Sequence, residues 1–139
     1  MKEKLKIGIV GSRRRATLRD RQLVYECVKS AVRNNPNKDI VIVSGACRSG
    51  ADSFAAEAAK VMGVELLEFP VTGSHASKWS YAQEAFARNE LIAEHSDMGF
   101  ALCHPDRTGG TENTVSHYIR MGKRVFNVLE DGSLELLKK

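Results

Sequence analysis

The sequence predicts a three-layer, doubly wound α/β domain built on a mainly parallel, five-stranded sheet. Short runs rich in β-branched residues alternate with longer segments of helical periodicity along the whole chain. Strands that alternate with helices form parallel sheets with right-handed crossovers. Glycine-containing turns follow several of these runs, as is typical of the carboxyl ends of such strands. The natural strand order is 3-2-1-4-5, and residues 1–139 form one domain.

Each element is placed by its apolar pattern and by the residues that end it. The expected strands cover residues 5–10, 40–43, 64–69, 98–103 and 124–129. The expected helices cover residues 20–32, 51–62, 82–93 and 111–121, with a short last helix over 133–139. Ser80 is expected to cap the third helix, with Gln83 placed for a capping box. Residues 71–78 are the least regular segment, and their role is left open.

Composition favours a single domain that binds an anion. The formal net charge is +4 and the isoelectric point is near 9.1, which favours nucleotides or nucleic acid as partners. No apolar run approaches the ~20 residues that span a bilayer, and residues 1–4 lead into a strand rather than a signal peptide. We therefore expect a cytoplasmic protein without membrane contact. Cys27, Cys47 and Cys103 lack metal-ligand spacing, so no metal site and no required cofactor are predicted.

The stretch 41–52 predicts a buried strand, a small-residue turn and the first turn of a helix. Ser44, Gly45 and Gly50 allow tight backbone geometry and the close approach of another molecule. Free N–H groups at the start of the following helix favour an anion, typically phosphate. The alternative is a turn that needs glycine only for packing. The role of Cys47 within this turn is left open.

Three turns are expected to meet at the carboxyl edge of the sheet, near the point where the strand order reverses. They contain Gly11, Ser12 and Arg13, then residues 44–52, then residues 108–111. Their convergence indicates a ligand more strongly than any single turn does. The predicted pocket is lined by Gly11, Ser12, Gly45, Arg88, Gly110 and Thr111.

Four pieces of the sequence resemble the SLOG superfamily of Rossmann-like proteins, in the same order. They are Ile9-Val10-Gly11-Ser12-Arg13, Ser44-Gly45-Ala46 with Gly50-Ala51-Asp52, Arg88-Asn89 with Ser96-Asp97, and Gly110-Thr111 with Gly122-Lys123-Arg124-Val125. The small size, the Gly-Ser-Arg opening and the Trp before Arg-Asn are most similar to the YspA-like branch. Related branches are the Lonely-guy phosphoribohydrolases and the DNA-processing-protein-A family. The resemblance implies a nucleotide or nucleotide-derived ligand, and self-association into a homo-oligomer.

The first two turns supply candidate contacts to phosphate and sugar. Ser12 and Arg13 follow a strand and precede a helix, so backbone N–H groups and a guanidinium would grip phosphate together. Arg14 and Arg15 either add to this contact or are simply solvated. Asp52 lies in the first turn of a helix, where it either complements the helix dipole or contacts a ribose hydroxyl.

The third and fourth helices supply the remaining candidates. Arg88 is the candidate for a ligand phosphate. Asn89, a poor former of helix interiors, either binds the ligand or bonds a neighbouring turn. Trp79 either stacks on a base or anchors packing. A second anion-binding helix N-terminus is formed by Gly109, Gly110 and Thr111, and Thr111 also suits the N-cap position.

The favoured function is a module that binds or senses a nucleotide or nucleotide-derived ligand. The alternative is hydrolysis of the N-glycosidic bond of nucleoside 5′-monophosphates, with Glu112 and Arg88 as catalytic candidates. This sequence departs from the Lonely-guy pattern Pro-Gly-Gly-x-Gly-Thr-x-Glu-Glu. Asn113 and Thr114 stand at its two glutamate positions, and Glu112 stands one residue early. Single-stranded DNA binding is a second alternative, disfavoured because aromatic residues are only 6% of the chain and do not cluster beside basic ones.

Overall fold

The computed structural model describes residues 2–46, 50–71 and 78–138. Cys47 and residues 72–77, whose roles the sequence leaves open, lie outside the described residues.

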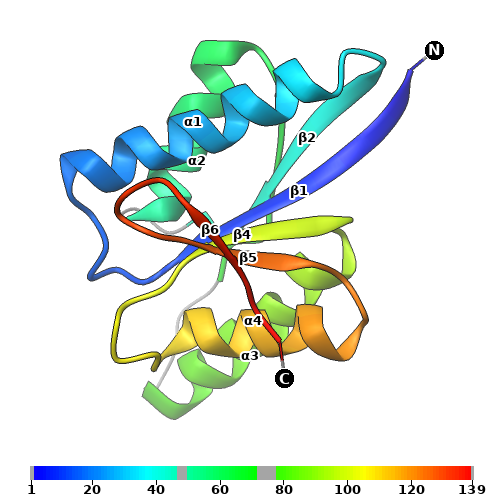
Figure 1. The fold of residues 1–139 in the computed structure, drawn as a ribbon. Helices are drawn as coiled ribbons and strands as arrows, with labels where there is room; N and C mark the ends of the chain where they lie inside the picture. Colours follow the sequence, from blue (N-terminus) through cyan, green and yellow to red (C-terminus); the bar gives the residue numbers. More distant parts are fainter. Residues whose placement is uncertain (1, 47–49, 72–77, 139) are drawn as a thin grey trace.

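A mostly parallel sheet forms the centre of the molecule, with helices on both faces (Figure 1). The strands are β1 (Glu3–Gly11), β2 (Lys38–Ser44), β3 (Glu65–Glu68), β4 (Met98–Leu102), β5 (Val125–Val128) and β6 (Leu134–Leu136). The helices are α1 (Leu18–Asn34), α2 (Ala51–Met62), α3 (Lys78–Glu94) and α4 (Gly110–Arg120). The strand order is β3-β2-β1-β4-β5-β6, with β1 to β5 parallel and β6 antiparallel to β5. The predicted fold class and the predicted order of the first five strands are confirmed.

The sixth strand corrects the expectation of a last helix over residues 133–139. Residues Leu134–Leu136 form a strand instead, with Leu134 and Leu136 on one side and Glu135 on the other. Gly132, at φ +90°, and the side chain of Asp131, which accepts a hydrogen bond from the Ser133 N–H at 2.8 Å, turn the chain back on itself. The segment therefore forms a hairpin with β5, in which Leu136 pairs with Phe126.

Helix starts also differ from the sequence-based expectations. In α1 a capping box between Thr17 and Asp20 starts the helix at Leu18. Ser80 lies inside α3, so the predicted cap there is wrong. The N-cap of α4 is Gly109 and not Thr111, so Thr111 is already within the first turn.

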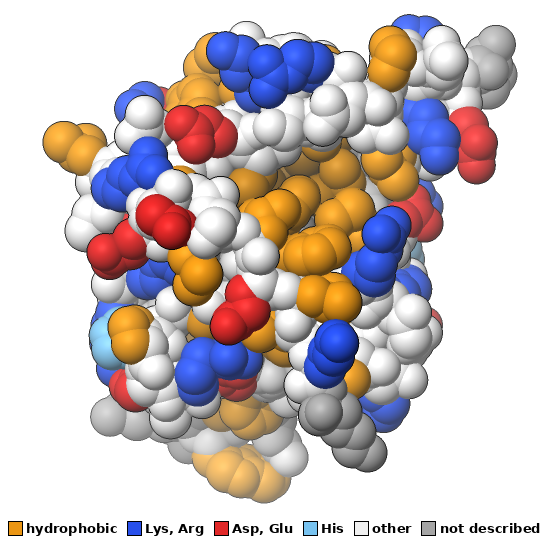
Figure 2. Space-filling model, viewed as in Figure 1, with side chains coloured by type: hydrophobic (Ala, Val, Ile, Leu, Met, Phe, Trp, Pro, Cys, Tyr) orange, Lys and Arg blue, Asp and Glu red, His pale blue; other side chains and the backbone are white. Residues whose placement is uncertain are grey.

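Helices α1 and α2 cover one face of the sheet, and α3 and α4 cover the other (Figure 1). A hydrophobic core lies on each face of the sheet, and alternate residues of β1 pack into one or the other. Ile7 and Ile9 pack towards α1 and α2, and Val10 packs towards α3 and α4. On the α1 face, hydrophobic side chains also gather over β4 and β5 beside the helix (Figure 2), where Phe100 and Phe126 are half-buried. None of the helices in the described part of the chain is long and apolar enough to cross a membrane.

Candidate ligand-binding site

A pocket of about 670 Å³ opens where the chain leaves β1, β2 and β4. The order β2-β1-β4 places these carboxyl ends side by side at the point where the strand order reverses. Its described lining is Val10, Gly11, Ser12, Arg13, Arg14, Gly45, Ala46, Asp52, Pro70, Val71, Tyr81, Ala85, Phe86, Arg88, Asn89, Ile92, Thr108, Gly109, Gly110, Thr111 and Thr114. A cavity of this size is within the range of small-molecule sites.

Most of the predicted site residues meet at this pocket. Those that line it are Gly11, Ser12, Arg13, Gly45, Asp52, Arg88, Asn89, Gly109, Gly110 and Thr111. Ser44, Gly50 and Trp79 are not part of the lining. Ser44 is fully buried, Gly50 at φ +72° packs against the Ser12 carbonyl, and Trp79 is 70% exposed. Contacts between the predicted residues of the lining and a ligand stay a prediction.

The turn after β1 is fixed by its own backbone. The Ser12 N–H donates to the Leu102 carbonyl at 3.0 Å, and the Arg15 N–H donates to the Ser12 carbonyl at 3.0 Å. The Ser12 hydroxyl oxygen accepts from the Arg14 N–H at 3.1 Å, which leaves the hydroxyl proton for another acceptor. Across the pocket, Arg13 Nη2 lies 3.4 Å from the Tyr81 hydroxyl.

The two arginines that follow are not simply solvated. Arg15 is 7% exposed, pairs with Asp20 at 3.0 Å and donates to the Val128 carbonyl at 2.5 Å, so the solvated alternative is wrong for this residue. Arg14 lines the pocket and binds Asp106 through both Nη atoms, at 2.5 and 2.8 Å. This guanidinium holds the pKa of the Asp106 carboxyl well below its usual range. The Arg14–Asp106 pair thereby joins the turn after β1 to the loop after β4.

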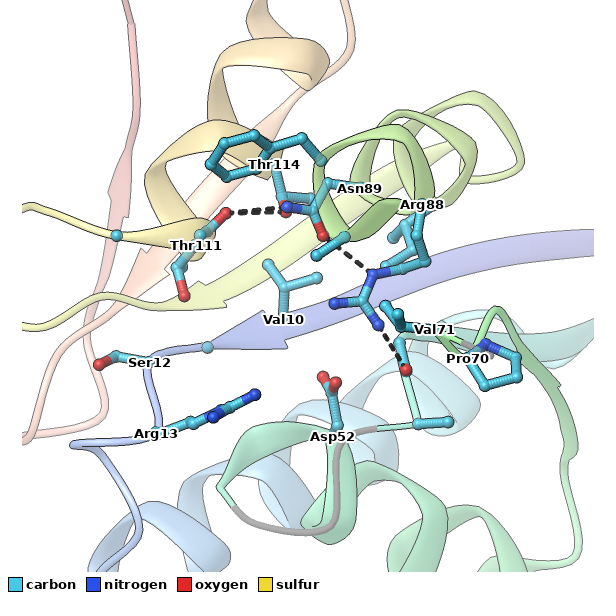
Figure 3. Close-up of a pocket in the computed structure, with 18 of the residues that line it drawn as sticks. Val10, Ser12, Arg13, Asp52, Pro70, Val71, Arg88, Asn89, Thr111 and Thr114 are labelled. Atoms are coloured by element: carbon cyan, nitrogen blue, oxygen red, sulfur yellow. Dashed lines mark hydrogen bonds between the residues drawn. The ribbon is translucent and has the colours of Figure 1, made fainter. Parts of the chain in front are cut away.

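Two helices begin beside the pocket without a side-chain cap. Gly50 and Gly109 are the N-caps of α2 and α4, at φ +72° and +98°, and neither can supply a side-chain acceptor for the first N–H groups. Thr111 in the first turn of α4 is 8% exposed, and Figure 3 shows it on the same side of the pocket as Ser12. Uncapped N–H groups and the positive end of the helix dipole favour an anion here.

Arg88 and Asn89 join α3 to the segments that follow β2, β3 and β4 (Figure 3). Arg88 Nη1 donates to the Gly45 carbonyl at 2.6 Å and to the Phe69 carbonyl at 3.3 Å. Asn89 Oδ1 accepts from Arg88 Nε at 3.1 Å, and Asn89 Nδ2 donates to the Gly110 carbonyl at 3.3 Å. The buried Asn89 therefore bonds a neighbouring turn, which is one of its two predicted roles. The described bonds of Arg88 do not involve Nη2.

Gly45 makes room for the charged groups at the centre of the pocket. A Cβ atom at Gly45 would lie 2.5 Å from Arg88 Nη1 and 2.9 Å from Asp52 Oδ2. The Arg88 guanidinium and the Asp52 carboxylate consequently face each other across this glycine.

The apolar side of the pocket was not predicted from the sequence. Pro70 and Val71 lie at one end, and α3 adds Tyr81, Ala85 and Phe86. The residues of α3 on this side stand at helical spacing and form one stripe of the helix: Tyr81, Ala85, Arg88 and Ile92. The predicted aromatic contact, Trp79, is two residues before Tyr81 and so points elsewhere on the helix.

Glu112 is held outside the pocket lining. Both of its carboxylate oxygens accept from Arg107, at 2.8 Å each, and this pairing lowers the pKa of the Glu112 carboxyl. Burial raises the pKa of the neighbouring Cys103 thiol to about 12, which favours the protonated thiol at neutral pH. Asp52 is the one carboxylate among the described lining residues. Within the described residues no group of three or more His, Cys, Asp or Glu side chains could hold a metal ion.

The family model of the YspA, cpYpsA-related SLOG family matches residues 6–75, half of the chain. The chain belongs to this family. The match includes the turns after β1 and β2, two of the three that form the pocket, and it confirms the predicted superfamily and branch.

A solved structure, the molybdenum cofactor carrier protein from Chlamydomonas reinhardtii, has the same fold. The two chains are 17% identical with a TM-score of 0.61, and the similarity covers 88% of this chain and 75% of the other. Comparison with curated proteins gives no match.

Proposed function

We propose that this protein binds or senses a nucleotide or nucleotide-derived ligand in the pocket at the carboxyl edge of the sheet. The observation that carries the proposal is the convergence of the turns after β1, β2 and β4 on one cavity, together with Arg13, Arg14 and Arg88. The solved carrier protein of the same fold supports a small-molecule ligand. Self-association and a cytoplasmic location are proposed on the resemblance and on composition alone.

The two sides of the pocket suit the two parts of a nucleotide. The start of α4 and the guanidinium groups of Arg13 and Arg88 attract a phosphate, since charge-assisted hydrogen bonds to phosphate are the strong ones. The apolar side, with Phe86 half-exposed beside Ala85, offers a surface on which a base can stack. A thermal-shift screen of nucleoside mono-, di- and triphosphates and dinucleotides identifies the preferred member, because a ligand that binds only the folded state raises the unfolding temperature.

Replacing Arg88 with alanine should weaken binding of the best nucleotide about 10- to 100-fold while the protein stays folded. A guanidinium hydrogen-bonded to a charged ligand contributes on the order of 1.5–3 kcal/mol. Isothermal calorimetry measures the affinity, and circular dichroism checks the fold. Arg88→Lys is the matched control, because lysine keeps the positive charge but lacks the paired N–H donors of the guanidinium. Unchanged affinity in Arg88→Ala would assign this residue to holding Gly45 and Phe69 and nothing more.

Release of free base from AMP, GMP, IMP, CMP or UMP should be little or none. Glu112 is engaged by Arg107 outside the pocket lining, and Asn113 accepts a hydrogen bond from Asn89 at 3.2 Å. An amide at that position cannot act as a general base. Chromatography of the free base over hours at micromolar protein is the measurement. Robust turnover that vanishes in Glu112→Gln would establish the hydrolase alternative instead.

A further inference from the structure

Part of the sheet face beside α1 is left open. Helices α1 and α2 pack chiefly on β1, β2 and β3, and among the described helices none covers β5 and β6 on this side. Val128 belongs to the core under α1 and pairs with Leu134, so Leu134 and Leu136 lie on this side of the sheet. These two leucines are 50% and 43% exposed. With the half-buried rings of Phe100 and Phe126, whose centroids are 6.2 Å apart, they form an apolar surface that we call the open face (Figure 2).

The amino end of β5 gives the open face a basic end. Arg124 lies two residues before Phe126, and Lys138 lies two residues after Leu136, so the alternation of a strand places both on the open face. Both residues are exposed. The register that pairs Phe126 with Leu136 puts Arg124 opposite Lys138, and like charges opposite each other are unfavourable in a sheet. Negative charge brought over this end therefore stabilises it.

The hairpin after β5 gives the other end of the open face an acidic character. Glu130 and Asp131 are both exposed there. Hydrogen bonds from Ser133 lower the pKa of the Asp131 carboxyl, so this group is ionised at neutral pH. Arg19 lies at the same end and donates to the Glu130 carbonyl at 2.8 Å and to the Gln22 side chain at 2.9 Å. Its charge offsets one of the two carboxylates and leaves this end negative.

We propose that the open face binds a second copy of this chain in a two-fold dimer, with the two β5 strands running in opposite directions. A contiguous exposed apolar surface with a polar border is typical of an interaction site. In this orientation the basic end of each copy lies over the acidic end of the other, and the two-fold axis makes this pairing twice. The opposite orientation places basic end on basic end. A partner with charge of a single sign is repelled at one end, whereas a second copy is attracted at both.

The first test measures the association of the unmodified protein by sedimentation velocity across the micromolar range. The open face is small for an interface, so we expect a reversible dimer whose fraction rises with protein concentration. This dimer gives the proposed self-association a surface, and it does not depend on nucleotide binding. A protein that stays monomeric throughout would overturn both the self-association and this surface, and would leave the proposed ligand binding untouched.

The second test exchanges the charges at the two ends. Arg124→Glu and Glu130→Arg each place like charges together at both contacts, so each variant alone should dimerise about 10-fold or more weakly. A mixture of the two variants restores opposite charges at both contacts and should form a heterodimer about as tight as the original. Lys60→Glu, an exposed charge reversal of the same size on α2, is the matched control and should leave the dimer unchanged. Single variants that dimerise normally, or a mixture that stays monomeric, would overturn the proposal.

The third test compares two leucines of similar exposure on opposite faces of the sheet. Leu136 is 43% exposed on the open face, and Leu91 is 40% exposed on α3. Leu136→Ser should weaken the dimer about 10-fold, because each copy loses apolar surface that the interface buries. Leu91→Ser should leave it unchanged, and thermal unfolding checks that both variants are folded. The reverse result would place the interface on α3 and overturn the assignment of the open face, while self-association itself would stand.

Discussion

Replacing Gly45 with alanine should abolish most nucleotide binding and leave the fold intact. The new Cβ would lie 2.5 Å from Arg88 Nη1 and 2.9 Å from Arg88 Cζ, closer than non-bonded carbon and nitrogen atoms approach. The guanidinium is the far end of a flexible side chain, so it moves away rather than the backbone. Arg88 then loses its bonds to the Gly45 and Phe69 carbonyls. We expect a loss of about 2 kcal/mol in binding, roughly 30-fold in the dissociation constant.

A double-mutant cycle separates this mechanism from a general disturbance of the turn. If Gly45→Ala acts through Arg88, it should cost almost nothing further in an Arg88→Ala background, because both changes remove the same interaction. The same best-bound nucleotide is used with all four proteins. Calorimetry gives the four affinities, and thermal unfolding gives the four stabilities. Additive losses would show that Gly45 acts on binding by another route.

The fold was predictable because its signals are local. The runs that form β1, β2 and β4 have the apolar pattern of buried strands, and the glycines after them stand at the positions where the chain must turn. Helix α2 was predicted with its observed bounds, because Gly63 ends it in the left-handed conformation that glycine favours. The three-residue β6 is too short to show a convincing period of its own, and its existence depends on pairing with β5.

The parts of the site that were missed depend on contacts distant in sequence. In the sequence Arg15 is one of three consecutive arginines. In the structure it is buried and donates a hydrogen bond to the Val128 carbonyl, 113 positions along the chain. The apolar side of the pocket depends on which face of α3 packs against the loops that follow β1 and β3. The helix period places Tyr81 and Arg88 on one stripe, but it does not say which stripe faces a ligand. Glu112 was considered as a catalytic residue because of its place in a motif. In the structure its ion pair with Arg107 fixes the position of its carboxylate.

Replacing Gly8 with alanine should destabilise the protein more than any change in the pocket. Gly8 lies in the middle of β1 against the fully buried Tyr118, whose hydroxyl donates to Ser96 Oγ at 2.9 Å. A Cβ at Gly8 would lie 1.8 Å from the Tyr118 hydroxyl oxygen, and this side chain has no free space into which to turn. Overpacking of this kind costs about 3 kcal/mol. Thermal unfolding should show a decrease in Tm of roughly 10 °C.

A second substitution identifies the clash. Tyr118→Phe removes the hydroxyl and should restore a large part of the stability lost in Gly8→Ala, although alone it costs about 1 kcal/mol by removing the bond to Ser96. Gly99 on β4 is the matched comparison, because a Cβ there would lie 2.7 Å from Tyr118 Cζ and 3.0 Å from Cε2, atoms that phenylalanine retains. Gly99→Ala should therefore gain much less from Tyr118→Phe. Equal rescue of both alanine variants would show that the aromatic ring shifts as a whole and that the hydroxyl is not what limits the space at Gly8.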